Sequence, residues 1–205
     1  MSKFRRFALT IALASVLPLI LVSCSSHPKR VDNLCSLLDD RNSWYQDANR
    51  SYEKWGVPVH VQMAIIHQES HFKDDARPPR GSFLWIFPGS RPSSAFGFAQ
   101  VLDGTWQWYI NKTGNNGADR DDFGDVTDFI GWYGSITSSK LKVSKWDAYG
   151  QYLAYHEGHG GYSRRSYNKK PWLIAVAKKV KRRADSYSKQ LYGCRKQLEK
   201  SWFWF

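Results

Sequence analysis

Apolar residues return at helical spacing along most of this chain, and this periodicity constrains the fold more than any other feature. Between residues 31 and 55 they are three, four or seven positions apart, which places them on one face of a helix. The members of this stripe are Val31, Leu34, Leu38, Tyr45, Ala48, Tyr52 and Trp55. Gly56 follows, and glycine commonly ends a helix because it adopts left-handed conformations at little cost. We therefore predict a helix over 31–55 in a mainly α-helical protein.

Turn and capping residues divide the rest of the chain into further helical stretches. Pro58 and Pro171 suit the first position of a helix, and Asp103 is placed to cap one. Gly114 and Gly193 are placed to end the helices that precede them. The predicted ranges are 58–69, 103–114, 125–138, 146–156 and 171–193.

The first 23 residues have the composition of a secretory signal. A charged start precedes an apolar run from Phe7 to Val22, which is short for a membrane span. The run ends in Leu21-Val22-Ser23-Cys24, which looks like a bacterial lipobox, where the cysteine is acylated and becomes the mature N-terminus. We predict a lipoprotein signal peptide over 1–23 and lipidation of Cys24. A cleaved signal followed by an ordinary cysteine is the alternative.

The segments next to this signal bear on where the protein resides. Ser25 stands where an aspartate would hold a lipoprotein at the inner membrane, which favours an outer-membrane anchor with the protein facing the periplasm. Several acyl chains would make that anchor stable. We expect a tether over 24–30, one domain over 31–200, and an aromatic tail over 201–205. The tail either inserts into the membrane interface or packs on the domain.

Cysteine content and net charge agree with an exported protein. Apart from Cys24 there are two cysteines, Cys35 and Cys194, an even pair for an oxidising compartment. A disulfide would join the first helix to the last, and two separate buried thiols are the alternative. The signal holds three of the twelve net positive charges, so the mature chain carries +9. This charge suits a polymer with carboxylates better than nucleic acid, which an exported lipoprotein rarely meets.

Three short segments carry the chemistry. They are Glu69-Ser70, the Ser-Ala-Phe-Gly-Phe-Ala-Gln stretch over 94–100, and Ala-Tyr-His-Glu-Gly over 154–158. Glu69 continues the apolar face of Ile65 and Ile66, so we expect its carboxyl to be partly buried. Burial raises the pKa of a carboxyl, which suits a general acid that must hold a proton near neutral pH. A surface glutamate at a frayed helix end is the plain alternative.

In this order, the three segments resemble the catalytic signatures of the soluble lytic transglycosylase family. That family has an E-S pair, an S-x-x-G-L-M-Q box and an A-Y-N-A-G box, and the resemblance covers roughly Gly56 to Trp172. It implies a mainly α, goose-type lysozyme-like domain with a two-lobed glycan-binding groove and no cofactor. It also implies that the partner is the glycan strand of peptidoglycan, cleaved between N-acetylmuramic acid and N-acetylglucosamine with formation of a 1,6-anhydro sugar.

The resemblance assigns a double role to Glu69. In the family one glutamate protonates the glycosidic bond and then acts as base while the muramic C6 hydroxyl attacks its own anomeric carbon. Because this nucleophile is intramolecular, no second carboxylate is required to activate water. Tyr155 is expected to face Glu69 and to orient it or stabilise charge in the transition state.

Further substrate contacts are implied around this pair. The predicted substrate-binding residues are Ser70, Ser94, Gly97, Gln100, His156 and Glu157. The serines lie beside the acid in the family, although each is often an ordinary turn or capping residue. Gly97 would let a sugar approach the backbone. Gln100 is expected to hydrogen-bond to the protein, to the substrate, or to both.

Two departures from the family pattern leave alternatives open. Phe98-Ala99 replaces Leu-Met, which is an exchange of volume at packing positions. His156-Glu157 replaces Asn-Ala and adds a carboxylate, which as a water-activating base would make the protein a lysozyme-type hydrolase. A non-catalytic peptidoglycan-binding lipoprotein is the third possibility.

The stretch over 77–93 makes the spacing between the first two segments longer than is common in the family. Its apolar part, Phe83 to Phe87, lies among prolines and glycines, so we expect a hairpin-like loop. The stretch forms either a wall of the glycan groove or a flap that covers the core. The residues that would build such a wall are Arg77, Arg80, Arg91, Phe83, Trp85 and Phe87.

Metal binding is not supported by the sequence. His67 and His71 are four residues apart, but the zinc-protease motif needs a glutamate directly after the first histidine. The acidic stretch over 119–124 has Phe123 at a position where a calcium loop needs a ligand. We expect no metal site.

Overall fold

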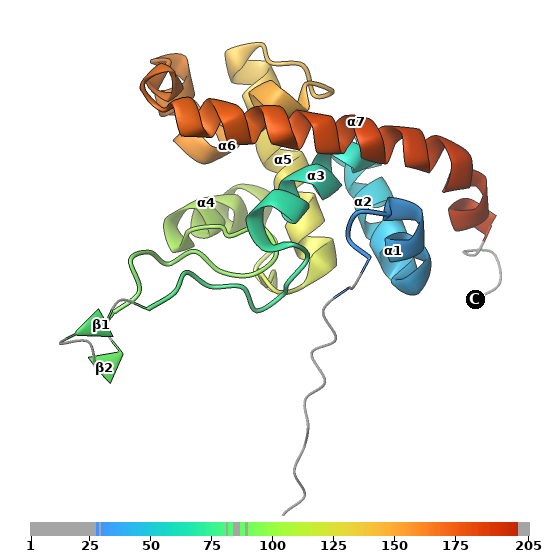
Figure 1. Ribbon diagram of the computed structural model, residues 1–205, viewed down its shortest axis with the longest axis horizontal. Helices are drawn as coiled ribbons and strands as arrows, with labels where there is room; N and C mark the ends of the chain where they lie inside the picture. The colour runs from blue at the N-terminus through green and yellow to red at the C-terminus, as the bar shows by residue number, and fades with distance from the viewer. Residues whose placement is uncertain (1–27, 29, 81, 84–86, 89, 201–205) are drawn as a thin grey trace, which may run out of the picture.

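The computed structural model confirms a mainly helical protein (Figure 1). It describes residues 28, 30–80, 82–83, 87–88 and 90–200. The proposed signal peptide, Cys24 and the aromatic tail therefore lie outside the described residues. The helices are α1 (Leu34–Asp40), α2 (Asn42–Trp55), α3 (Val59–Ser70), α4 (Asp103–Thr113), α5 (Phe123–Leu141), α6 (Ala148–Ser163), the 3-10 helix η1 (Ser166–Lys169) and α7 (Pro171–Lys200).

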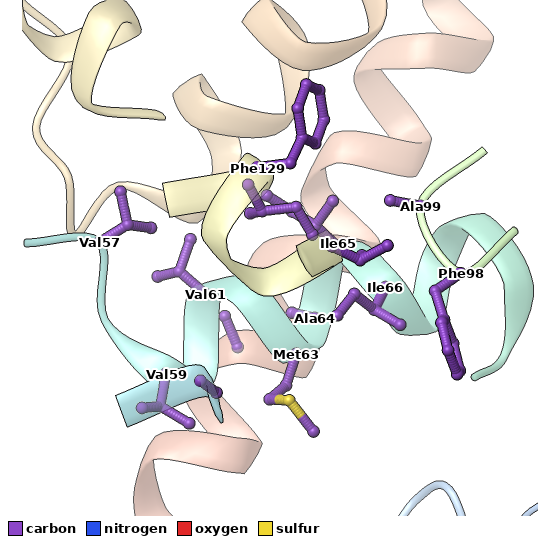
Figure 2. Packing of buried hydrophobic residues seen from close by; sticks show 14 of the residues in the cluster. Val57, Val59, Val61, Met63, Ala64, Ile65, Ile66, Phe98, Ala99 and Phe129 are labelled. Carbon is purple, nitrogen blue, oxygen red and sulfur yellow. The ribbon is translucent and has the colours of Figure 1, made fainter. Parts of the chain in front are cut away.

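Helix α3 forms the centre of the core. Apolar side chains surround it, among them Val61, Met63 and Ile66, which are fully buried (Figure 2). A helix that is apolar on all sides must be enclosed by other elements. The long helix α7 runs across one side of the molecule and packs on α3 and α6, while α2 packs on α5 (Figure 1).

The prediction of one helix over 31–55 is wrong, because this range holds two helices. The chain breaks at Arg41, whose φ of −129° is not helical, and so separates α1 from α2. Before it, the side chain of Asn33 accepts a hydrogen bond from the amide of Ser36 at 3.0 Å and caps α1. Apolar periodicity persists across the break because both helices face the same core.

The last helix is also longer than predicted, because α7 continues through Gly193 to Lys200. Leu191 and Leu198, on either side of this glycine, are both buried, and their packing outweighs the low helix propensity of one glycine. The predicted ends at Gly56 and Gly114 are confirmed, with φ values of 78° and 75°.

The ends of the domain are fastened to each other. A disulfide between Cys35 and Cys194 joins α1 to α7, as the pair of cysteines predicted. The side chain of Gln190 on α7 accepts a hydrogen bond from the amide of Leu34 at 2.6 Å and donates one to the carbonyl of Asp32 at 3.1 Å. The start of the described chain is therefore tied to the second half of α7.

The stretch between α3 and α4 carries the hairpin that the sequence predicted. β1 (Ser82–Phe83) pairs antiparallel with β2 (Phe87–Pro88), and the pair projects away from the helices (Figure 1). Trp85 lies outside the described residues.

Of the described helices, none is long and apolar enough to cross a membrane.

Candidate active site

Glu69 lies at the end of α3, where the chain turns sharply out of the helix. After Ser70, the last residue of the helix, His71 and Phe72 have positive φ values of 54° and 62°, and the Phe72 side chain is buried. Glu69 borders a surface groove of about 530 Å³ that also reaches residues of α4, α5 and α6. The carboxyl is mostly enclosed by protein but opens on this groove.

The surroundings of Glu69 favour its protonated form. Burial raises the pKa of this carboxyl to about 7, and a hydrogen bond from Tyr152 on α6 acts in the opposite direction. Burial raises the pKa because the charged carboxylate loses its hydration, whereas the neutral acid loses much less. Glu69 therefore keeps a proton near neutral pH, and the frayed surface position considered from the sequence is excluded.

Tyr152 is a residue that the sequence motifs missed. Its side chain is 4% exposed, and it hydrogen-bonds to Glu69. It lies three residues before Tyr155 on the same helix, so the two rings share a face. The three-residue spacing from Tyr155 was the one sign in the sequence that Tyr152 could lie near Glu69. Other tyrosines of this chain are also at helical spacing, so the sequence did not single out Tyr152.

Tyr155 lies near Glu69 but directs its proton elsewhere. Its hydroxyl donates to the backbone carbonyl of Ala99 at 2.6 Å. Burial and the charge of Glu69 hold the pKa of Tyr155 well above its usual value. This hydrogen bond joins the 154–158 segment to the 94–100 segment and fixes the groove between them.

Ser70 and Ser94 both bond to the backbone of the protein. Ser70 is buried, and its hydroxyl accepts from the amide of Lys73 at 3.2 Å. Ser94 is exposed, and its hydroxyl accepts from the amide of Asp103 at 3.1 Å, the first residue of α4. The helix therefore begins at Asp103, and Ser94 caps it in place of the aspartate predicted to do so.

Gly97 and Gln100 shape the loop beside the groove. Gly97 is buried with φ at 75°, and a Cβ atom there would lie 1.9 Å from the carbonyl oxygen of Arg120. The backbone that approaches Gly97 closely is thus that of Arg120. Gln100 borders the groove, and its side-chain amide donates to the carbonyls of Ala76 and Gly97 at 2.8 and 2.9 Å.

His156 and Glu157 also border the groove, but the Glu157 carboxylate is engaged by the protein. It accepts hydrogen bonds from Lys170 at 2.7 Å and from Ser166, and its side chain is 3% exposed. These bonds lower the pKa of Glu157, so it is held as a carboxylate. His156 lies 3.3 Å from Glu157, and its ring meets Trp172 edge-on at 5.2 Å.

The backbone of α6 breaks just after this pair. Gly158 has φ 70° and ψ 159°, which is not helical, and a Cβ atom there would have no neighbour within 4 Å. Gly158 itself lines the groove. Helix resumes after this break and continues to Ser163, so α6 extends beyond the end predicted at residue 156.

An aromatic wall of the groove comes from α5. Phe129 and Tyr133 line it, and Tyr133 stacks on His159 with ring centroids 4.3 Å apart. His159 in turn hydrogen-bonds Thr137 at 2.9 Å. The sequence predicted the helix but gave no role to these rings, because core and groove residues follow the same helical period.

Part of the 77–93 stretch packs on the 94–100 segment. The guanidinium of Arg77 lies 4.0 Å from the ring of Phe96. Arg91 donates to the carbonyl of Pro78.

Within the described ranges, no group of three or more His, Cys, Asp or Glu side chains is placed to hold a metal ion. The rings of His67 and His71 are 4.7 Å apart, and burial lowers the pKa of His67 to about 4.

Comparison with known proteins gives one match. A family model described as a transglycosylase SLT domain matches residues 12–194. No curated protein and no solved structure matches the chain. The matched range includes all three segments and every residue of the groove.

Proposed function

We propose, because the chain belongs to the transglycosylase SLT domain family, that it cleaves the β-1,4 bond between N-acetylmuramic acid and N-acetylglucosamine in peptidoglycan and forms a 1,6-anhydro sugar. The observation that carries this proposal is Glu69, a mostly enclosed carboxyl whose pKa burial raises to about 7 and which borders a surface groove of about 530 Å³.

The reaction uses Glu69 twice. Its carboxyl donates a proton to the glycosidic oxygen as the bond from that oxygen to the muramic anomeric carbon breaks. The C6 hydroxyl of the same muramic residue then bonds to the anomeric carbon and gives its proton to the Glu69 carboxylate. The acid is thereby restored, and no water is consumed.

Neighbouring side chains support both steps. The hydroxyl of Tyr152 hydrogen-bonds Glu69 and steadies the carboxylate formed after the first step. Tyr155, bonded to Ala99, holds the two walls of the groove at a fixed spacing. Phe129 and Tyr133 are 1% and 6% exposed, so they shape the apolar side of the groove rather than stack on the sugars.

A hydrolytic reaction is less well supported. It needs a second carboxylate free to activate water, and Glu157 is the candidate at this groove. Its carboxylate is already bonded to Lys170 and Ser166 and is almost fully covered. The intramolecular reaction requires no such group.

The products distinguish these reactions. Purified sacculi are treated with the chain and with its Glu69→Gln variant, and the released muropeptides are analysed by mass spectrometry. Anhydro-muropeptides from the unaltered chain alone are expected. Reducing-end products would replace the proposal with a hydrolase, and binding without products would favour a non-catalytic protein.

We further propose that Cys24 is acylated and that the protein is an outer-membrane lipoprotein facing the periplasm. The proposal is supported by the lipobox-like Leu21-Val22-Ser23-Cys24 sequence and by Ser25 after it. Incorporation of labelled palmitate, abolished by Cys24→Ser, tests the acylation. Sucrose-gradient separation of the two membranes tests the location.

A further inference from the structure

A second groove lies at the opposite end of α3 from Glu69. Its volume is about 220 Å³, and it is formed by α2, the start of α3, the loop before α6, and α7. The two grooves share no residue. Val59 borders this groove and Glu69 the other, and ten helical residues correspond to about 15 Å along α3.

Exposed aromatic rings border this second groove. Trp146 is 61% exposed and Tyr192 is 93% exposed, although large apolar side chains are usually covered. Only two other large apolar side chains in the described part of the chain are comparably exposed, Leu102 and Trp172. Two of these four described residues therefore lie at one small groove.

The ring of Trp146 is supported from behind. It lies 5.5 Å from the ring of His60 and meets Tyr52 edge-on at 6.4 Å. These contacts hold the indole in place while one side remains open to solvent. The groove is thus prepared for a flat apolar ligand surface before any ligand binds.

One cationic side chain lines the groove, and further cations lie near it on α7. Arg195 borders it, paired with Glu199 at 2.8 Å, and the exposed Lys189 and Lys196 lie on the same helix. Asn49 and Ser188 add polar groups to the lining. A ligand that suits this set has flat apolar faces, hydroxyl or amide groups, and negative charge.

The helix that supplies Tyr192 and Arg195 is well anchored. The disulfide of Cys194 joins it to α1, and the neighbouring Leu191 is 8% exposed. The groove therefore keeps its shape without help from a ligand.

We propose that this groove is a second, non-catalytic binding site for the glycan strand of peptidoglycan. The faces of amino sugars stack on Trp146 and Tyr192, and the carboxylates of the lactyl and peptide groups are attracted by the cations of α7. This inference rests on the proposed function, because it takes the same polymer as the ligand. Such a site would hold the enzyme on the wall while Glu69 acts on another position.

Binding is tested on a variant that does not consume the polymer. The full chain carrying Glu69→Gln is purified in mild detergent and sedimented with purified sacculi over a range of protein concentrations. Adding Trp146→Ala or Tyr192→Ala is expected to weaken binding about five- to tenfold, since exposed rings at such sites contribute around a factor of ten. Trp146→Phe, which keeps a ring, is the matched control and is expected to bind nearly as the parent does.

Activity on short soluble glycan fragments completes the test. With Glu69 intact, Trp146→Ala is expected to cleave these fragments at the unaltered rate, because they are too short to reach both grooves. Sacculus binding that is unchanged in both alanine variants would overturn the second site, even if the enzyme is active. Weaker binding of the variants without cleavage by the unaltered chain would support the second site and overturn the proposed reaction.

Discussion

Replacing Glu69 by glutamine is expected to stabilise the protein above neutral pH while it abolishes activity. The unfolded chain releases this proton near pH 4.5, whereas the folded protein holds it until about pH 7. Between these values the folded state binds more protons, so the free energy of unfolding of the unaltered protein falls as the pH rises. Below pH 4.5 both states are protonated, and above pH 7 both are ionised.

The size of the effect follows from the pKa. Each unit of difference corresponds to about 1.4 kcal/mol, and we expect about 2–3 kcal/mol because water in the groove reaches one side of the carboxyl. Glutamine has nearly the same shape and does not titrate. The stability difference between Glu69→Gln and the unaltered protein should therefore grow by this amount from pH 4.5 to pH 8.

Urea unfolding monitored by tryptophan fluorescence measures this difference. The urea midpoint of the variant minus that of the unaltered protein is the quantity compared. This difference should be about 1 M larger at pH 8 than at pH 4.5. Glu53→Gln, which removes an exposed carboxylate of α2, controls for the loss of one negative charge. A difference that stays constant with pH would show that burial does not raise the pKa of Glu69.

Three further perturbations test other features of the structure. Tyr152→Phe removes a hydrogen bond that lowers the pKa of Glu69, so the fall of activity on the alkaline side should move to higher pH in a pH–rate profile; a move to lower pH would refute this role. Gly97→Ala places a Cβ atom 1.9 Å from the Arg120 carbonyl oxygen at a φ of 75° and should cost about 2–4 kcal/mol in chemical denaturation; an unchanged midpoint would contradict the packing described. Replacing both Cys35 and Cys194 by serine removes a cross-link between residues 159 positions apart and should lower the free energy of unfolding by about 3–5 kcal/mol. The unfolding is measured without reductant, and a loss below 1 kcal/mol would show that the rest of the fold already holds α1 on α7.

The sequence predicts those features that depend on local pattern. The helical class follows from apolar spacing, and the enclosure of Glu69 follows from the apolar residues around it on α3. The disulfide was expected from an even pair of cysteines behind a segment that resembles a secretory signal. Each of these depends on residues that are close in the chain or on composition alone.

The features that the sequence did not predict depend on contacts between distant elements. Nothing near Glu157 in the sequence indicates that Lys170, between η1 and α7, will hydrogen-bond to it. Helix α7 continues through Gly193 because leucines on both sides are buried by other elements. The role of Tyr152 was hidden for the same reason, since only the fold brings one particular tyrosine to the end of α3.

The link between Cys35 and Cys194 has a consequence for the order in which the protein is assembled. The chain is made from its N-terminus, so α1 exists long before the helix to which it is bridged. Its hydrogen bonds to Gln190 must also wait for the last part of the chain. Helix α1, the first of the described helices, is thus among the last to be fixed in place, and a product interrupted before α7 would leave it without its anchor.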